Sequence, residues 1–487
     1  MRIGKRIVYW QKAREWIAIP LFSIVLLIPC FWQSRIQSAD LSSHIYNAWL
    51  ASQIHQGKAP GLWISSQSNN VLFDLMLEWL LVRVGPDLAQ RFAVSISVLV
   101  FGWGAVLFIF RVGSRNWWFA GPCVAMLSYG FVFHMGFFNF YLALGLCLWY
   151  LAISWGKAWR VHAMAAPLLI VAWMAHPFPV VWAVGTTAYA VVATRLQPRR
   201  RPLLLVLGLA IVVAAGYILT HRYASVWYLD QATLITGANQ IALFGIKYVL
   251  LFAALLLVWL LLLRKLVKDM GVIHLFLTIP FQLWLLNTAA VVLIPDRVLF
   301  PQFGQSFGFI AERLSLGAGL SMCALLVAAH TGRLVKVALA AIALLFFGFL
   351  YTDDRTLNHR EDQLDAALSA LPQGGRVVSF LPDPSLYSLC VHHDLDRACV
   401  GRCLSYANYE PSSRQFRIRA APGNGIVLDK SVDVDAVSGG TYVVQSRDLP
   451  IYLVYPCGFG LSEVCSRQLQ LGEKVAGSRE IAPAPAR

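Results

Sequence analysis

The sequence predicts an all-α polytopic membrane domain over residues 1–351, with about eleven transmembrane helices, followed by a small α+β domain over residues 352–487 outside the cytoplasm. Of the 487 residues, 58% are hydrophobic and only 13% are charged, and the mean hydropathy is +0.61. The charged share is roughly half that of a soluble globular protein. These values exclude a disordered chain, a small disulfide-stabilised protein and an ordinary soluble enzyme.

The charged residues are unevenly distributed along the chain. Residues 1–351 contain 26 Lys and Arg against 9 Asp and Glu, whereas residues 352–487 contain 14 against 16. The positive excess therefore belongs to the apolar part, where basic residues usually mark membrane topology. We interpret the excess in that way rather than as a nucleic-acid-binding surface, and we expect no nucleic acid partner.

Apolar runs along residues 1–351 predict the spans. A spanning helix needs about 20 mostly apolar residues, because every backbone polar group must be satisfied inside the hydrocarbon. The predicted spans are residues 16–33, 92–110, 116–133, 138–156, 162–175, 178–194, 202–220, 244–263, 272–294, 314–330 and 337–351.

The first external loop, residues 34–91, is predicted to contain juxtamembrane helices. Its segment 71–84 is too short to span and carries Asp74, Glu78 and Arg83. At helical spacing the apolar residues of this segment fall on one side. This pattern is typical of an amphipathic helix that lies at the membrane interface.

Basic residues predict the orientation. Arg2, Lys5 and Arg6 precede the first span, which places the N-terminus in the cytoplasm. Counted from there, later basic clusters, such as the one at 199–201, fall in cytoplasmic loops, and residues 352–487 fall outside. No Asn-x-Ser/Thr sequence occurs, which favours a bacterial periplasm. We therefore expect a multi-pass protein of the bacterial inner membrane with a periplasmic C-terminal domain.

The cysteines agree with an oxidising external compartment. Five of them lie after residue 351, at Cys390, Cys399, Cys403, Cys457 and Cys465. Disulfides are expected there, with one thiol left over. We predict that Cys457 pairs with Cys465, since Gly458-Phe-Gly can turn tightly between them, and that Cys390 pairs with Cys399 or Cys403. These cysteines lie near His392 and His393, but disulfides are favoured over zinc, so no metal site is assigned.

The C-terminal domain is predicted to be α+β from its local patterns. Residues 356–371 have a helical pattern. Strand-like runs are 376–381, 415–418, 426–428, 441–445 and 451–455.

Acids and histidines gather on the predicted external side, and Asp40 is the leading candidate among them. It lies just after the first span in Ala39-Asp40-Leu41-Ser42-Ser43-His44, and His44 follows one helical turn later on the same face. The alternative role for Asp40 is N-capping, since this segment starts a plausible helix.

The layout of the first external loop carries a resemblance. Asp40 and a helix are followed by a Gly57-x-x-Pro60 turn, a juxtamembrane helix, and Gly85 and Arg91 leading into the second span. This layout resembles the GT-C superfamily of membrane glycosyltransferases, which use sugars linked to polyprenyl phosphate or pyrophosphate. Many members carry an acidic pair where this chain has Asp40-Leu41. The resemblance implies a GT-C-like fold, and it implies that Asp40, with His44 beside it, is the base that deprotonates an acceptor hydroxyl.

Other external residues are candidates for substrate binding, and each has a structural alternative. The run Gly136-Phe-Phe-Asn139-Phe-Tyr141, preceded by His134, suits sugar stacking, or it is an interfacial aromatic belt. His176-Pro-Phe-Pro is a tight external turn that is either functional or structural. Arg222, Arg297 and Arg313 are candidates for binding the leaving phosphate. Alternatively, Asp296-Arg297 and Glu312-Arg313 are neighbours that neutralise each other.

The resulting hypothesis is a membrane glycosyltransferase at the external face. Its expected partners are membrane lipids, a polyprenyl-phosphate-linked sugar donor and an acceptor that is a glycan, a lipid or a protein. No cofactor is expected, and the sequence does not decide whether a divalent metal is required. The alternatives are a transporter or lipid flippase, and a non-catalytic membrane scaffold with the same fold. The span cores lack the mid-depth charged residues and paired broken helices typical of transporters.

Overall fold

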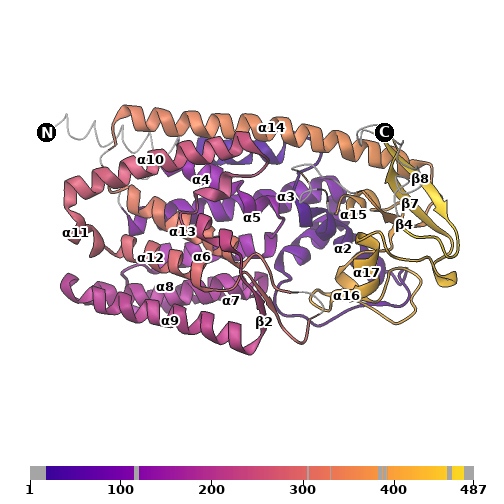
Figure 1. The fold of residues 1–487 in the computed structure, drawn as a ribbon, viewed down its shortest axis with the longest axis horizontal. Coiled ribbons are helices and arrows are strands. Elements are labelled where there is room, and N and C mark those ends of the chain that lie inside the picture. Colours follow the sequence, from indigo (N-terminus) through magenta and orange to yellow (C-terminus); the bar gives the residue numbers. More distant parts are fainter. Residues whose placement is uncertain are drawn as a thin grey trace, which may run out of the picture.

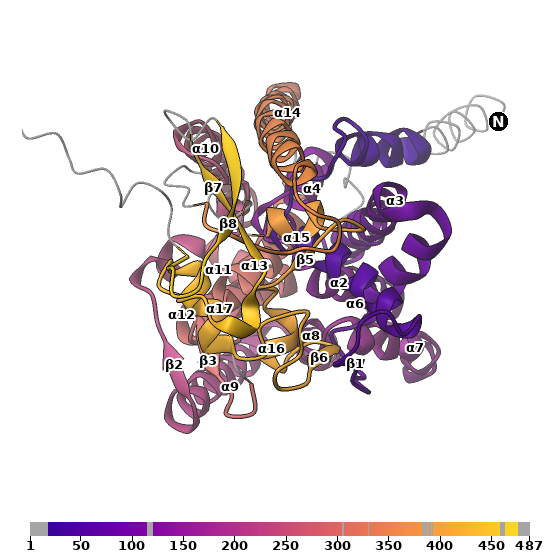
Figure 2. The same ribbon diagram turned by 90° about the vertical axis from the view of Figure 1, so that its right-hand side faces the viewer.

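The computed structural model describes residues 18–113, 120–303, 306–329, 331–381, 387, 391, 393–457 and 463–475. Most of these residues are helical, and the helices form an elongated bundle with a small sheet at one end (Figure 1). The sheet and its short helices lie over the helix ends at that side of the bundle, as the view along the long axis shows (Figure 2). The structure therefore confirms the prediction of a mostly helical protein with a small sheet region.

The bundle contains an apolar helix at Ala18–Cys30. The helices after it are α2 (Ala39–His55), α3 (Leu72–Val112), α4 (Gly121–Ser128), α5 (Phe131–His134), α6 (Phe138–Ser154), α7 (Trp159–Ala175), α8 (Pro177–Arg195), α9 (Arg201–Arg222), α10 (Ile246–Met270), α11 (Val272–Phe276), α12 (Ile279–Leu293), α13 (Ile310–Leu326) and α14 (Arg333–Ser369). Some helices of the bundle follow one another directly, whereas longer segments connect α2 to α3, α9 to α10 and α12 to α13.

Five helices within the described residues are long and apolar enough to cross a membrane. They are α3, α8, α9 with the turn before it, α10 and α14. Ala18–Cys30, α6, α7 and α12 are shorter apolar helices. Large apolar side chains such as Leu203 on α9 and Leu250 on α10 are exposed, as expected for lipid contact. The helices support a membrane protein, while the count of eleven spans stays a prediction.

The segment predicted to lie at the interface forms the first part of α3. Gly85 interrupts this helix with φ +79° and ψ 167°, a conformation that glycine adopts without the steric cost of a Cβ. Pro86 follows and starts the second helical part, where a missing backbone donor costs little. Two helical parts therefore meet at Gly85, between the predicted interface helix and the predicted second span.

The boundary predicted between residues 351 and 352 lies inside the continuous helix α14. This helix runs along most of the molecule and ends beside the sheet (Figure 1). Its second half is polar, but Asp353, Asp354 and Glu361 are buried there. A helix, and not a flexible linker, therefore connects the bundle to the C-terminal part.

The described residues between 370 and 475 form a four-stranded sheet with short helices. The strand order is β5 (Leu404–Ser405), β4 (Arg376–Ser379), β7 (Ile451–Pro456) and β8 (Val464–Leu469). Strand β4 is parallel to β5 and β7, and β7 and β8 form an antiparallel pair. The short helices are α15 (Asp394–Ala398), α16 (Glu410–Ser413) and α17 (Ser431–Ser438).

The strand predictions for this part were correct in two places and wrong in others. Strand β4 lies within the predicted run 376–381. Strand β7 matches the predicted run 451–455 and is one residue longer. Residues 426–428 and 441–445 are not strands, apart from one isolated bridge at Val443. The predicted strand at 415–418 is displaced to β6 (Ile418–Ala420), because its partner is a distant loop that local pattern does not reveal.

The first external loop and the C-terminal part are joined by pairing and packing. Strand β1 (Leu62–Ile64) of the loop pairs antiparallel with β6, and Tyr46 and Leu50 of α2 share an apolar cluster with Val377 of β4. Elsewhere on this side of the bundle, β2 (Ala224–Val226) pairs with β3 (Arg297–Leu299).

Two ion pairs, one of them buried, add to this connection. Arg397 of α15 donates from Nε to Glu361 of α14 at 2.9 Å and from Nη1 to the carbonyl of Ile36 at 2.9 Å. Arg35 pairs with Asp362 of α14 at 2.6 Å. The residues just before α2 are therefore held between α14 and α15.

Two disulfides lie in the C-terminal part. Cys457 pairs with Cys465 across a Cα–Cα distance of 5.7 Å, which confirms that prediction. The second prediction is wrong, because Cys399 and Cys403 pair with each other across 4.5 Å. The turn after α15 brings these two cysteines together, and the backbone N–H of Cys403 donates to the carbonyl of Cys399 at 3.0 Å. Cys390 lies outside the described residues.

Candidate functional site

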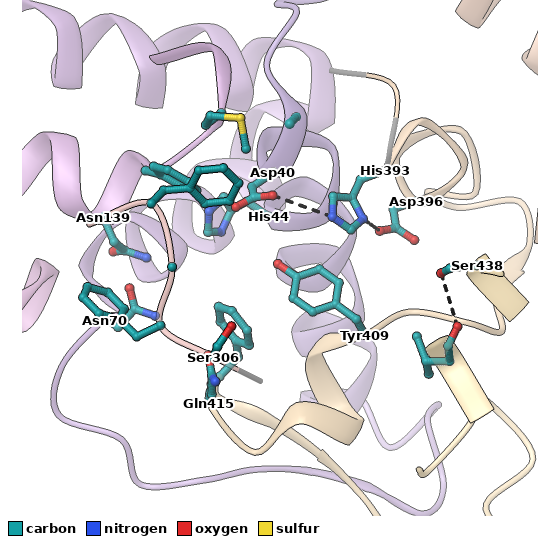
Figure 3. Close-up of a pocket in the computed structure, with 18 of the residues that line it drawn as sticks. Asp40, His44, Asn70, Asn139, Ser306, His393, Asp396, Tyr409, Gln415 and Ser438 are labelled. Carbon is teal, nitrogen blue, oxygen red and sulfur yellow. Dashed lines mark hydrogen bonds and ion pairs between the residues drawn. The ribbon is translucent and has the colours of Figure 1, made fainter. Parts of the chain in front are cut away.

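A cavity of about 490 Å³ lies where the bundle meets the C-terminal part (Figure 3). Its walls come from the start of α2, the turn before α6, the turn between α7 and α8, residues 306–313, and the segments around α15, α16 and α17. Of the residues predicted to form the site, those that line the cavity are Asp40, His44, Asn139, His176, Arg297 and Arg313.

Asp40 occupies the first turn of α2, and close backbone packing fixes its position. Ser38 is the N-cap residue, so Asp40 does not hold the capping position. The backbone N–H of Asp40 donates to the carbonyl of Met135 at 3.3 Å. Gly136 has φ +78°, and a Cβ at this residue would lie 2.5 Å from the backbone nitrogen of Asp40. Only glycine therefore allows this approach of the turn before α6 to Asp40.

The carboxylate of Asp40 faces a histidine of the C-terminal part. Oδ1 of Asp40 lies 3.6 Å from Nε2 of His393, and Nδ1 of His393 lies 3.3 Å from Oδ2 of Asp396 (Figure 3). The ring of Tyr409 lies 4.8 Å from that of His393. The cavity therefore combines acids and a histidine from two parts of the chain more than 350 residues apart.

His44 is held by an acid of α3 and not by Asp40. Its Nδ1 lies 2.6 Å from Oδ1 of Asp74, and Oδ2 of Asp74 accepts from Nδ2 of Asn139 at 2.7 Å. Burial alone would lower the pKa of His44, but the charge of Asp74 and its hydrogen bond raise the pKa to about 9. The imidazolium form of His44 is therefore favoured at neutral pH.

Both polar groups of Asn139 have partners inside the protein. Its Oδ1 accepts from the backbone N–H of Phe73 at 2.9 Å, while its Nδ2 binds Asp74. Asn139 thus joins the start of α3 to α6 and orients the acid that holds His44.

Arg313 lines the cavity and is surrounded by aromatic rings. Its guanidinium carbon lies 4.1 Å from the ring centroid of Phe137 and 4.7 Å from that of Phe307. Its Nε and Nη1 are buried and have no hydrogen-bond partner among the described residues. Buried guanidinium N–H groups without acceptors are costly unless a bound anion supplies the acceptors.

Arg297 and His176 complete this wall. The guanidinium of Arg297 lies 5.5 Å from the ring centroid of Phe309, and its Nε lies 3.9 Å from Oδ2 of Asp296. Nδ1 of His176 accepts from the backbone N–H of Phe178 at 3.1 Å, so this histidine caps α8 while it lines the cavity. His176 therefore has the structural role that was one of the two predictions for this turn. Its place on the cavity wall also allows it to contact a ligand.

The other predicted site residues do not line the cavity. His134 is buried, with Nδ1 3.2 Å from the carbonyl of Gly130. The hydroxyl of Tyr141 donates to the carbonyl of Ser128 at 3.0 Å. Arg222 is exposed at the end of α9. Glu312 lies beside Arg313 in the first turn of α13, and its Oε2 is buried outside the cavity.

Several cavity residues were not predicted. His393 stood out only through its place beside the cysteines of the C-terminal part, and Asp396 and Tyr409 were not singled out. Asp74, which binds His44 but does not itself line the cavity, stood out only as an external acid. No local pattern links these residues to Asp40, because the link is made by the packing of the C-terminal part onto α2.

Within the described residues, no group of three or more His, Cys, Asp and Glu side chains is arranged to hold a metal ion. Cys399 and Cys403 are used in a disulfide. The site is therefore described by its acids, histidines and arginines.

The fold and the cavity define a helical membrane protein with a polar site between its bundle and its C-terminal part. Compared with known proteins, the chain matches no family model, no curated protein and no solved structure. The roles of the cavity residues therefore follow from geometry and chemistry alone.

Proposed function

We propose that this protein is a membrane glycosyltransferase that transfers a sugar from a polyprenyl-phosphate-linked donor to an acceptor hydroxyl at the external membrane face. The observation that carries the proposal is the placement of Asp40, Arg297 and Arg313 on one cavity. Such a transfer needs a carboxylate to deprotonate the acceptor hydroxyl and cationic groups, such as guanidinium groups, to stabilise the leaving phosphate.

In this proposal Asp40 is the general base. The acceptor hydroxyl attacks the anomeric carbon and gives its proton to the carboxylate of Asp40. The bond from the anomeric carbon to the phosphate oxygen breaks, and the phosphate leaves with the electron pair. A phosphate needs charge stabilisation more than protonation, and the unpaired donors of Arg313 suit that role.

The size and lining of the cavity support a sugar-sized ligand. Its volume of about 490 Å³ falls within the range of roughly 300–1,000 Å³ that ligand pockets have. Phe137, Phe140 and Phe307 give aromatic surface near Arg313, and aromatic faces pack well against the apolar faces of sugars. Asp40 lies between this wall and the polar wall of the C-terminal part, where an acceptor would enter.

Asp40→Asn is the test of the proposed function. We expect the rate of sugar transfer from a polyprenyl phosphate donor to fall by about 10²- to 10⁴-fold, because the base is lost while the shape is kept. The thermal midpoint should change little, since Ser38 and not Asp40 is the N-cap residue.

The measurement is turnover of a radiolabelled lipid-linked sugar by the purified protein in lipid vesicles. Asp87→Asn is the matched control, because Asp87 is an exposed acid outside the cavity. Transfer by Asp40→Asn at the parental rate would refute the assignment of Asp40 as the base.

A further inference from the structure

A row of three side chains crosses the cavity from α2 to the C-terminal part (Figure 3). Asp40 lies 3.6 Å from His393, and His393 lies 3.3 Å from Asp396 on its other ring nitrogen. The imidazole is the only bridge in this row between residues of the first external loop and residues of α15. Asp40 and Asp396 are thus linked through the imidazole of His393.

The far end of the row is held firmly. Asp396 is buried and accepts from the hydroxyl of Ser405 at 2.5 Å. Its neighbour Arg397 is bound to Glu361 of α14, and the Cys399–Cys403 disulfide closes the turn after α15. His393 therefore has a fixed position relative to the bundle, and not merely relative to its own loop.

The charges around His393 come from each element packed against it. Asp40 faces it from α2, Asp394 and Asp396 belong to α15, and the ring of Tyr409 lies against it from the segment before α16. Burial alone would lower the pKa of His393, but the hydrogen bond to Asp396 and the charges of Asp396, Asp40 and Asp394 raise the pKa above its usual value. The cationic ring is therefore favoured between two carboxylates.

We propose that His393 is the positioning residue of the transfer reaction: its imidazole, anchored by Asp396, holds the carboxylate of Asp40 directed into the cavity. The inference rests on the proposed function. In the transfer step the hydroxyl proton moves to Asp40 and the electron pair leaves with the phosphate, while His393 neither gains nor loses a proton. The C-terminal part thereby supplies a required piece of the site in the bundle.

A positioning role predicts a loss of turnover and a changed pH profile. His393→Gln should lower kcat by about 10- to 100-fold, since a misdirected catalytic group costs about that much. The KM for the donor should change by less than about 3-fold, because the arginines are untouched. The pH–rate profile should also change, because the variant lacks the titrating imidazole of His393, which lies beside Asp40 and whose pKa is raised above its usual value.

The design includes a matched control and a second variant. His359→Gln is the control, since His359 is an exposed histidine on α14 outside the cavity. Asp396→Asn weakens the anchor while leaving the imidazole in place, and it should shift kcat and the pH profile in the same direction by a smaller factor. Parental kcat and an unchanged pH–rate profile in a folded His393→Gln or Asp396→Asn variant would overturn the proposal.

A measurement without turnover separates this inference from the proposed function. The titration of His393 is followed by NMR of histidine-labelled protein in nanodiscs, with His393→Gln assigning the signal. In Asp40→Asn the titration should move to lower pH, because one of the two carboxylates is lost. An unmoved titration would refute the pairing. A moved titration in a protein that transfers no lipid-linked sugar would support the pairing and reject the glycosyltransferase.

Discussion

At the scale of single residues, Arg313 is the side chain whose surroundings most clearly call for a ligand. Phe137 and Phe307 lie against its guanidinium, and its Nε and Nη1 have no hydrogen-bond partner among the described residues. Burying N–H donors that have no acceptor is costly. In the protein without ligand, Arg313 therefore lowers the free energy of unfolding. A phosphate group would supply the missing acceptors in a geometry that guanidinium groups bind well.

Arg313→Gln should therefore weaken binding of the donor without lowering the stability of the protein. We expect the KM for a polyprenyl phosphate donor to rise by about 10- to 100-fold, which corresponds to the loss of charged hydrogen bonds. The thermal midpoint of the protein without donor should stay the same or rise, because an unpaired buried charge is removed. Arg83→Gln, at an exposed arginine outside the cavity, serves as the control. A large fall in thermal midpoint would indicate a structural role for Arg313 instead.

Gly136 gives a second prediction at this scale. Gly136→Ala should lower turnover by at least about 10-fold, because its Cβ would meet the backbone of Asp40 at 2.5 Å and displace the base. Gly57→Ala is the matched control, since Gly57 also has a positive φ, of +71°, but has nothing within 4 Å of the added Cβ. Both variants bear similar backbone strain. Equal turnover in the two would contradict the role of Gly136 in placing Asp40.

At the scale of elements, the second half of α14 anchors the C-terminal part. Glu361 of this helix forms a buried ion pair with Arg397 of α15. Arg397 also donates a hydrogen bond to the backbone carbonyl of Ile36. This arrangement sets the distance between α15 and the start of α2, and so the distance between His393 and Asp40. An anchor in one helix thus fixes the geometry of a site formed by two others.

Glu361→Gln should loosen this anchor. We expect the free energy of unfolding of the C-terminal part to fall by ~3–5 kcal/mol, because a buried guanidinium loses its counter-charge. Limited proteolysis should then cut residues 370–475 faster than in the parent. Asp362→Asn is the control, since 60% of the Asp362 side chain is exposed and such pairs contribute less than about 1 kcal/mol. Equal cleavage rates in both variants would argue against the anchor.

At the scale of the whole molecule, the cavity exists only because the bundle and the C-terminal part are packed together. The bundle contributes Asp40 and the arginines, and the C-terminal part contributes His393, Asp396 and Tyr409. Both must lie on the same side of the membrane, and the distribution of Lys and Arg predicts that this is the external side.

Reporter fusions test that orientation. Alkaline phosphatase fused after residue 487 should be active and a green fluorescent protein dark, whereas fusions after residue 199 should show the reverse, because 199 lies in a predicted cytoplasmic loop. Fluorescence at residue 487 with no phosphatase activity would contradict the predicted orientation and would place the cavity in the cytoplasm.

The predictions made from sequence succeed where the pattern is local. Apolar runs indicated the helices, and the short spacing of Cys457 and Cys465 indicated their disulfide. Asp40 and Arg313 stood out because charged residues beside apolar spans are rare. The predicted pairing of Cys390 was wrong because cysteine spacing alone leaves several pairings open.

By itself, the sequence determined that the chain is a mostly helical membrane protein, the positions of most helices, and part of the cavity wall on the bundle side, which includes Asp40, Arg297 and Arg313. These features depend on hydrophobicity and charge over windows of a few turns. Only the tertiary structure decided that His393 and Asp396 stand beside Asp40, that His44 is bound to Asp74, and that His134 and Tyr141 lie away from the cavity. Some of these contacts join segments more than 350 residues apart. They arise from the packing of buried surfaces against each other, which leaves no periodic trace along the chain.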